Sequence, residues 1–238
     1  QKLVNLTLVL YFFATLYIFW GSAFLYQDLN KIDLPAHFAS DMLHDLAQRL
    51  VAHLPILSQQ TMPAPRISAC VLVAITNEDK PKLLLTKRSS QLSSHAGEMA
   101  FVGGRVDDGD LDTAHTALRE AYEEVGLPCA MAQIIGYLPY QVSKKGDRVR
   151  PVVALISPNL NLLGAESEVW QIVWADFLHF LQPATPHTMC LQRYGNQPFV
   201  TPAWQVQGEI VWGLTARVIA DLVHIGFGLH QTWYYTQA

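Results

Sequence analysis

Residues 103–127 read GGRVDDGDLDTAHTALREAYEEVGL, a glycine pair followed by an acidic loop and a segment with helical periodicity. Asp110 or Asp112 can cap the start of a helix here, because a short acceptor side chain bonds the exposed N–H groups of the first turn. Gly126 can adopt the left-handed conformation that ends a helix. These limits predict a helix from Thr113 to Val125. We expect one side of this helix to pack against the rest of the protein.

One side of the predicted helix is apolar and the adjoining side is acidic. Residues at helical spacing form a stripe that we expect to be buried: Ala114, Ala117, Leu118, Ala121 and Val125. Glu120, Glu123 and Glu124 lie beside the stripe, where like charges three and four residues apart repel one another. A hard divalent cation with oxygen ligands, Mg²⁺ or Mn²⁺, would neutralise them and also bind substrate phosphates. A solvated acidic face is the alternative interpretation.

The stretch Gly104–Leu127 resembles the Nudix box, in which a glycine and a spacer precede Arg-Glu-apolar-x-Glu-Glu-x-Gly-apolar. Its spacer before Arg119 is one residue longer than the common form and lacks the usual glutamate. Four aspartates supply acidity there instead: Asp107, Asp108, Asp110 and Asp112. The resemblance implies an α/β/α sandwich with a mixed sheet, and metal-dependent hydrolysis of a diphosphate.

Two stretches upstream resemble the extension specific to coenzyme A pyrophosphatases within that superfamily. They are Leu84–Ser89 (LLTKRS) and His95–Phe101 (HAGEMAF), with departures at Ser93, where Arg is usual, and Val102, where Pro is usual. The resemblance implies cleavage of coenzyme A or its thioesters to 3′,5′-ADP and 4′-phosphopantetheine or its acyl form. Two alternatives stay open: a Nudix hydrolase of another nucleoside diphosphate derivative, such as ADP-ribose or a dinucleotide, and a Nudix-fold binding module without turnover.

The chemistry and the resemblance together assign roles within the box. Glu120 and Glu124 are the expected metal ligands, and Glu123 is a further ligand or the residue that orients water. The Gly103–Gly104 pair allows the backbone to approach a ligand, and the resemblance implies that the second carbonyl completes the metal shell. Arg119 is expected to orient these glutamates through a bidentate pair.

The general base and the substrate contacts are less determined by the sequence. Glu98, Glu123 and Glu168 are the candidates for the base. His95 and Arg88 are candidates for substrate contact, with a structural histidine and a solvated charge as the respective alternatives. Lys87 is a weaker candidate than its neighbour for binding phosphate.

The composition of the chain limits the kinds of partner that it is expected to bind. The formal net charge is −4, which does not favour nucleic acid, so the expected partner is a small coenzyme A-like diphosphate. Lys144, Lys145 and Arg148 either contact the 3′-phosphate of coenzyme A or form a solvated hairpin tip. Three scattered cysteines, Cys70, Cys129 and Cys190, indicate a reducing compartment and hence a cytoplasmic catalytic domain.

The N-terminal region is long and apolar. Leu3–Tyr26 carries no charge and is long enough to cross a bilayer as a helix, which would anchor the protein to a membrane. A signal peptide and an upstream extension of the true start are the alternatives. We therefore divide the chain into an apolar segment, residues 1–41, and a Nudix domain, residues 42–238, which begins with an amphipathic helix. For the aromatic tail Trp233–Tyr235 we expect core packing or a homodimer contact.

The remaining pattern alternates strands with two principal helices. A polar, proline-containing linker, Ser58–Arg66, precedes the strands, and the passage up to Pro202 is proline-rich. The predicted strands are Ile67–Ile75, Lys82–Lys87, Met99–Val102, Ile134–Leu138, Val149–Ile156, Val169–Trp174 and Glu209–Trp212. A helical turn is expected at Asp176–Leu181, and a closing helix at Thr215–His224.

Overall fold

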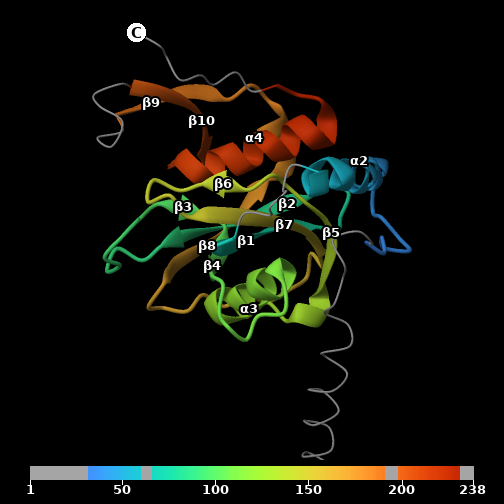
Figure 1. Ribbon diagram of the computed structural model, residues 1–238, viewed down its shortest axis with the longest axis horizontal. Coiled ribbons are helices and arrows are strands. Elements are labelled where there is room, and N and C mark those ends of the chain that lie inside the picture. Colours follow the sequence, from blue (N-terminus) through green and yellow to red (C-terminus); the bar gives the residue numbers. More distant parts are fainter. Residues whose placement is uncertain (1–31, 60–65, 191–197, 231–238) are drawn as a thin grey trace, which may run out of the picture.

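A computed structural model describes residues 32–59, 66–190 and 198–230, and it contains a mixed sheet between helices (Figure 1). The main path of the sheet is β3-β2-β1-β7-β5; β4 pairs with β1, β6 with β7, and β8 with β2. Strands β1 and β7 are parallel, whereas β2, β4, β5, β6 and β8 pair antiparallel with their neighbours. The strands are β1 Ala69–Thr76, β2 Lys82–Arg88, β3 Met99–Ala100, β4 Val102–Arg105, β5 Ala132–Tyr137, β6 Gln141–Val142, β7 Arg148–Ile156 and β8 Val169–Asp176.

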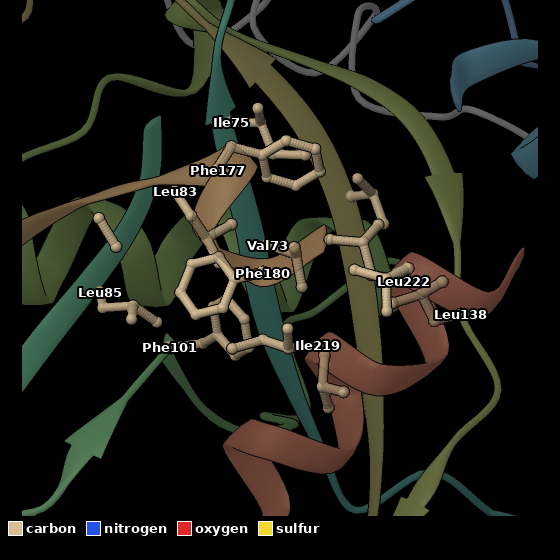
Figure 2. Packing of buried hydrophobic residues seen from close by; sticks show 14 of the residues in the cluster. Val73, Ile75, Leu83, Leu85, Phe101, Leu138, Phe177, Phe180, Ile219 and Leu222 are labelled. Atoms are coloured by element: carbon tan, nitrogen blue, oxygen red, sulfur yellow. The ribbon is translucent and has the colours of Figure 1, made fainter. Parts of the chain in front are cut away.

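Helices cover both faces of this sheet. Helix α3 (Thr113–Val125) lies on one face, and α2 (Asp41–Gln59) and α4 (Gly213–Phe227) lie on the other (Figure 1). Successive residues of β1 alternate between the two cores, as a strand requires: Leu72 packs on the α3 side and Val73 on the α4 side. Figure 2 shows the α4-side core, with Phe101, Phe177, Phe180 and Ile219 in contact around β1. The mixed α/β fold with a mixed sheet is therefore confirmed.

Helix α3 has the predicted limits. The backbone N–H of His115 donates to Asp112 Oδ1 at 2.7 Å, and Gly126 ends the helix with φ +68°. The predicted stripe is buried. Glu124, predicted to lie on the acidic side, is buried as well, so the acidic side of the helix faces partly into the protein.

The predicted strand Met99–Val102 is wrong in its extent. Met99–Ala100 (β3) pairs with β2, whereas Val102–Arg105 (β4) pairs with β1. The chain crosses between two partner strands at Phe101, whose side chain fills the α4-side core. The glycine pair consequently belongs to a strand, where its backbone is fixed by the ladder to β1.

The proline-rich passage contains strands that the sequence did not predict. A three-stranded sheet contains β9 (Thr185–Cys190), β10 (Pro198–Val206) and β11 (Glu209–Val211). Proline lacks an N–H and normally argues against a strand. Here Pro186 and Pro202 lie opposite each other in the antiparallel pair, so both missing donors fall at the same point of the ladder.

Other elements differ from the prediction in length or were not predicted. Helices α2 and α4 are longer than expected, β6 was not predicted, and the turn η2 (Phe177–Leu181) is where we expected a helical turn. Helix α2 packs its apolar side into the α4-side core with Leu43, Leu46 and Leu50 fully buried. The linker that follows α2 therefore connects two parts of one packed unit.

Residues 32–41 also contact the domain. The backbone N–H of Ala39 donates to Asn77 Oδ1 at 2.9 Å, and Gln133 Nε2 donates to the carbonyl of Asp33 at 3.3 Å. Phe38 packs against the α4-side core. The division at residue 42 stays a prediction, but the contacts indicate that the folded unit begins before it.

Within residues 32–59, 66–190 and 198–230, no helix combines the length and apolar character needed to span a bilayer. The predicted span Leu3–Tyr26 and the tail Trp233–Tyr235 lie outside the described residues.

Candidate active site

The glycine pair lets α3 approach β4 closely. A Cβ on Gly104 would overlap the carboxylate of Glu120, and one on Gly103 would overlap the carbonyl of Cys70. Gly103 also has φ +154°, a conformation that side chains rarely adopt. The two glycines therefore place backbone directly beside a predicted metal ligand.

Arg119 is the centre of a hydrogen-bonded network. Its guanidinium forms a bidentate pair with Asp110, with Nε to Oδ1 at 2.9 Å and the second terminal nitrogen to Oδ2 at 3.1 Å. The first terminal nitrogen donates to Glu120 Oε1 and to Glu123 Oε2, both at 3.0 Å. The carbonyl of Arg105 accepts a further bond at 2.9 Å. Arg119 thus holds two predicted metal-binding glutamates, as expected, but its bidentate partner is an aspartate of the spacer.

Asp110 was not singled out for this role by the sequence. Its side chain is 1% exposed, and it also accepts a hydrogen bond from the Thr116 hydroxyl at 2.9 Å. Burial acts to raise the pKa of Asp110, but hydrogen bonds from Arg119, from the Asp107 backbone N–H and from Thr116 outweigh burial and lower the pKa to about 2. The sequence offered one signal, the four aspartates that stand in the spacer where the usual glutamate is missing.

Glu124 is the most enclosed of the three box glutamates, with 4% of its surface exposed. Burial raises its pKa to about 8; the charge of Arg88 and a hydrogen bond from the Gly103 N–H oppose this, while the charges of Glu168 and Glu120 add to it. Burial likewise raises the pKa of Glu120, against the lowering effect of the neighbouring arginine. Carboxylates are therefore crowded and partly desolvated at one end of α3.

Arg88 enters this site from the end of β2. Its Nε is buried and has no hydrogen-bond partner within the described part of the chain. A buried donor without a partner is costly, so this atom indicates a place where an acceptor binds. Lys87 points elsewhere, because its Nζ lies 2.6 Å from Glu209 Oε1. The register of β2 and β8 shifts between these two residues.

The loop between β2 and β3 follows Arg88 and contains two further candidate residues, His95 and Glu98. The backbone N–H of Arg88 donates to the Glu98 carbonyl at 3.0 Å, and the N–H of Ser89 donates to the Glu168 carbonyl at 2.8 Å. His95 Nδ1 lies 3.0 Å from Glu98 Oε2, and His95 has φ +57°, which is uncommon for a residue with a side chain. The structure therefore brings Arg88 and Glu168 close to the box glutamates, and it pairs His95 with Glu98 in the adjoining loop.

The donor set suits a hard divalent cation. Glu120, Glu123, Glu124 and the Gly104 carbonyl offer oxygen ligands, and a cation would offset the charge of the buried carboxylates. Within the described residues no three His, Cys, Asp or Glu side chains already surround one metal position. Glu120 and Glu123 are turned toward Arg119 instead.

The fold and this arrangement of acids define a Nudix-type hydrolase, and the comparison with protein families agrees. The NUDIX domain family matches residues 65–188. An uncharacterized Nudix hydrolase NudL of Enterobacter sp. (strain 638) is 37% identical over 180 residues, covering 76% of this chain and 92% of that protein. The NudL of Cronobacter sakazakii is 41% identical over 154 residues, covering 65% and 80%. The chain belongs to the Nudix hydrolase family and is an enzyme of that family.

Solved structures of low sequence identity are also similar. A binary complex of the C. elegans Ap4A hydrolase has a TM-score of 0.40 at 20% identity, covering 46% of this chain and 80% of that one. The NUDIX domain of Shewanella oneidensis NrtR complexed with ADP ribose has a TM-score of 0.40 at 21% identity, covering 50% and 77%.

Proposed function

We propose that the protein hydrolyses the diphosphate of coenzyme A or its thioesters, with Mg²⁺ or Mn²⁺, to 3′,5′-ADP and 4′-phosphopantetheine or its acyl form. The observation that carries the proposal is the position of the stretch resembling coenzyme A pyrophosphatases. Its Arg88 acts electrostatically on the buried Glu124, and its two halves form β2, β3 and the loop between them. Residues that would select the substrate therefore form a wall of the candidate metal site.

In this proposal the residues of the box hold the metal. Glu120, Glu123, Glu124 and the Gly104 carbonyl would be its ligands, with Arg119 fixing the orientation of the first two. When bound, the cation supplies a lower pKa for water and neutralises charge on the phosphoryl oxygens.

The remaining residues bind substrate and move a proton. Arg88 donates its unpartnered Nε–H to a phosphate oxygen. We assign Glu168 as the acceptor of the proton of the attacking water, since it lies close enough to Glu120 and Glu124 for its charge to act on both. The other candidates are engaged elsewhere: Glu123 with Arg119, and Glu98 with His95. His95 borders the substrate, held in place by Glu98.

The test is a substrate panel. The purified full-length chain is incubated with Mn²⁺ or Mg²⁺ and with coenzyme A, acetyl-coenzyme A, ADP-ribose or a diadenosine polyphosphate, and the products are separated by chromatography. We expect 3′,5′-ADP from coenzyme A, metal dependence that EDTA abolishes, and a lower kcat/KM for ADP-ribose. Cleavage of ADP-ribose as well as or better than coenzyme A would overturn the substrate assignment, and no turnover of any compound would support a binding module.

A further inference from the structure

The turn between β6 and β7, residues 143–147, is basic and is organised by its own hydrogen bonds. Ser143 Oγ accepts from the backbone N–H groups of Lys145 at 3.2 Å and Asp147 at 3.1 Å. The N–H of Ser143 donates to the Asp147 carbonyl at 2.8 Å, and Gly146 has φ +87°, which allows the tight turn. Lys144 and Lys145 therefore project from a defined turn, which reduces the entropy lost when they bind a ligand.

Other elements bring further groups to this turn. Arg105, at the end of β4, is 76% exposed and lies 3.8 Å from the Asp147 carboxylate. The ammonium of Lys144 lies 5.0 Å from the ring centre of Trp212, next to the start of α4. A cation over an aromatic ring keeps its charge. We call Arg105, Lys144 and Lys145 the hairpin patch.

The hairpin patch adjoins the candidate active site. Arg105 follows Gly104, which lies against the Glu120 carboxylate, and the Arg105 carbonyl accepts a bond from Arg119. Arg105 pairs with Ala69. Ala69 in turn pairs with Val149 of β7. Strands β4 and β7 are therefore two strand spacings, about 10 Å, apart at this point. Arg105 therefore lies between the box and the hairpin turn.

We propose that the hairpin patch is a subsite for a phosphomonoester that the substrate carries apart from its diphosphate, such as the 3′-phosphate of coenzyme A. This inference rests on the proposed function. Three basic residues lie at or beside one turn of a chain whose formal net charge is −4, and the carboxylate of Asp147 lies 3.8 Å from the guanidinium of Arg105. A doubly charged phosphate would be attracted to this turn, whereas a nucleoside diphosphate lacking the third phosphate would gain little from it.

The test compares two substrates that differ by this phosphate. The variant Lys144→Met/Lys145→Met is made in the full chain, and kcat/KM is measured for coenzyme A and for 3′-dephospho-coenzyme A. The ratio of the two values should fall about tenfold, since charge-assisted contacts to phosphate are lost for one substrate only. The control is Lys82→Met, at the opposite end of β2 from Arg88, where the side chain is 50% exposed. It should leave the ratio as it is.

A second measurement needs neither turnover nor metal. Calorimetric titration with 3′,5′-ADP and with 5′-AMP should show that the wild-type protein prefers 3′,5′-ADP and that the double variant has lost most of this preference. An equal loss for both substrates, an unaltered ratio, or equal affinity of the wild type for both nucleotides would overturn the subsite. If coenzyme A is not cleaved at all, the proposed function fails, and the nucleotide titration still decides whether the hairpin patch binds the extra phosphate.

Discussion

Replacing Asp221 by asparagine tests the electrostatics of the interface between α4 and β6. Burial raises the pKa of Asp221 to about 6, although a hydrogen bond from Gln141 and the charge of Arg217 oppose the rise. The difference from the ordinary value of 3.8 corresponds to about 3 kcal/mol. Because the folded protein favours the neutral acid, this group contributes stability below about pH 4, and that contribution is lost as pH rises through about 6.

Asparagine has the shape of the neutral acid and can still accept the hydrogen bond from Gln141. We therefore expect Asp221→Asn to increase the free energy of unfolding by up to about 3 kcal/mol at pH 8, with the gain shrinking toward zero near pH 4. Urea titrations of wild type and variant across this range measure it. The control is Asp79→Asn in the exposed turn before β2. A gain that does not vary with pH, or a variant less stable than wild type at pH 8, would refute the reasoning.

Three further predictions concern the site and the start of the domain. Glu124→Gln should lower kcat by about two to three orders of magnitude while the protein stays folded, because the buried oxygen that we propose as a metal ligand loses its charge; steady-state kinetics and circular dichroism measure this. Asp110→Asn should weaken Mn²⁺ binding and cost about 1–3 kcal/mol of stability, because Arg119 loses its bidentate anion; calorimetry and urea unfolding measure these. Deleting residues 1–41 should lower the midpoint of thermal unfolding, because the contacts to Asn77 are removed.

Each of these predictions has a matched control in the chain. Glu166→Gln changes an exposed acid of the nearby loop and should leave kcat within about twofold of wild type, as is usual for surface changes. Asp108→Asn changes an exposed aspartate of the same spacer and should leave Mn²⁺ affinity as it is. Deleting residues 1–31 keeps the contacts of residues 32–41. Near-normal kcat in Glu124→Gln, unaltered Mn²⁺ affinity in Asp110→Asn, or equal melting of the two truncated chains would contradict the respective prediction.

Much of the fold followed from local signals. The limits of α3 were predictable because capping by Asp112 and the left-handed Gly126 depend on neighbouring residues alone. The strands β1, β2, β7 and β8 were predictable because each contains a short stretch of mostly apolar residues. Strands β9 and β10 were missed because their prolines suit a strand only when a particular partner lies opposite, and that is a tertiary property.

The residues of the candidate site were likewise predictable only where the signal is local. The acids Glu120, Glu123 and Glu124 were recognisable because their spacing on one helix is local. The place of Asp110 under Arg119 was not, because four aspartates stand in the spacer and their side chains face different directions. Of the neighbours Lys87 and Arg88, it is Arg88 that enters the site. Lys87 instead pairs with Glu209, which is far away in the sequence.

The sequence by itself determined the family resemblance, the acidic helix and the need for a cation, since these depend on residue type and spacing along one element. The tertiary structure decided how enclosed each acid is, which basic side chain is left without a partner beside Glu124, and that Arg105 lies beside the lysines of the β6–β7 turn. Burial and charge pairing depend on contacts between elements that meet only when the chain is folded, so no local sequence pattern predicts them.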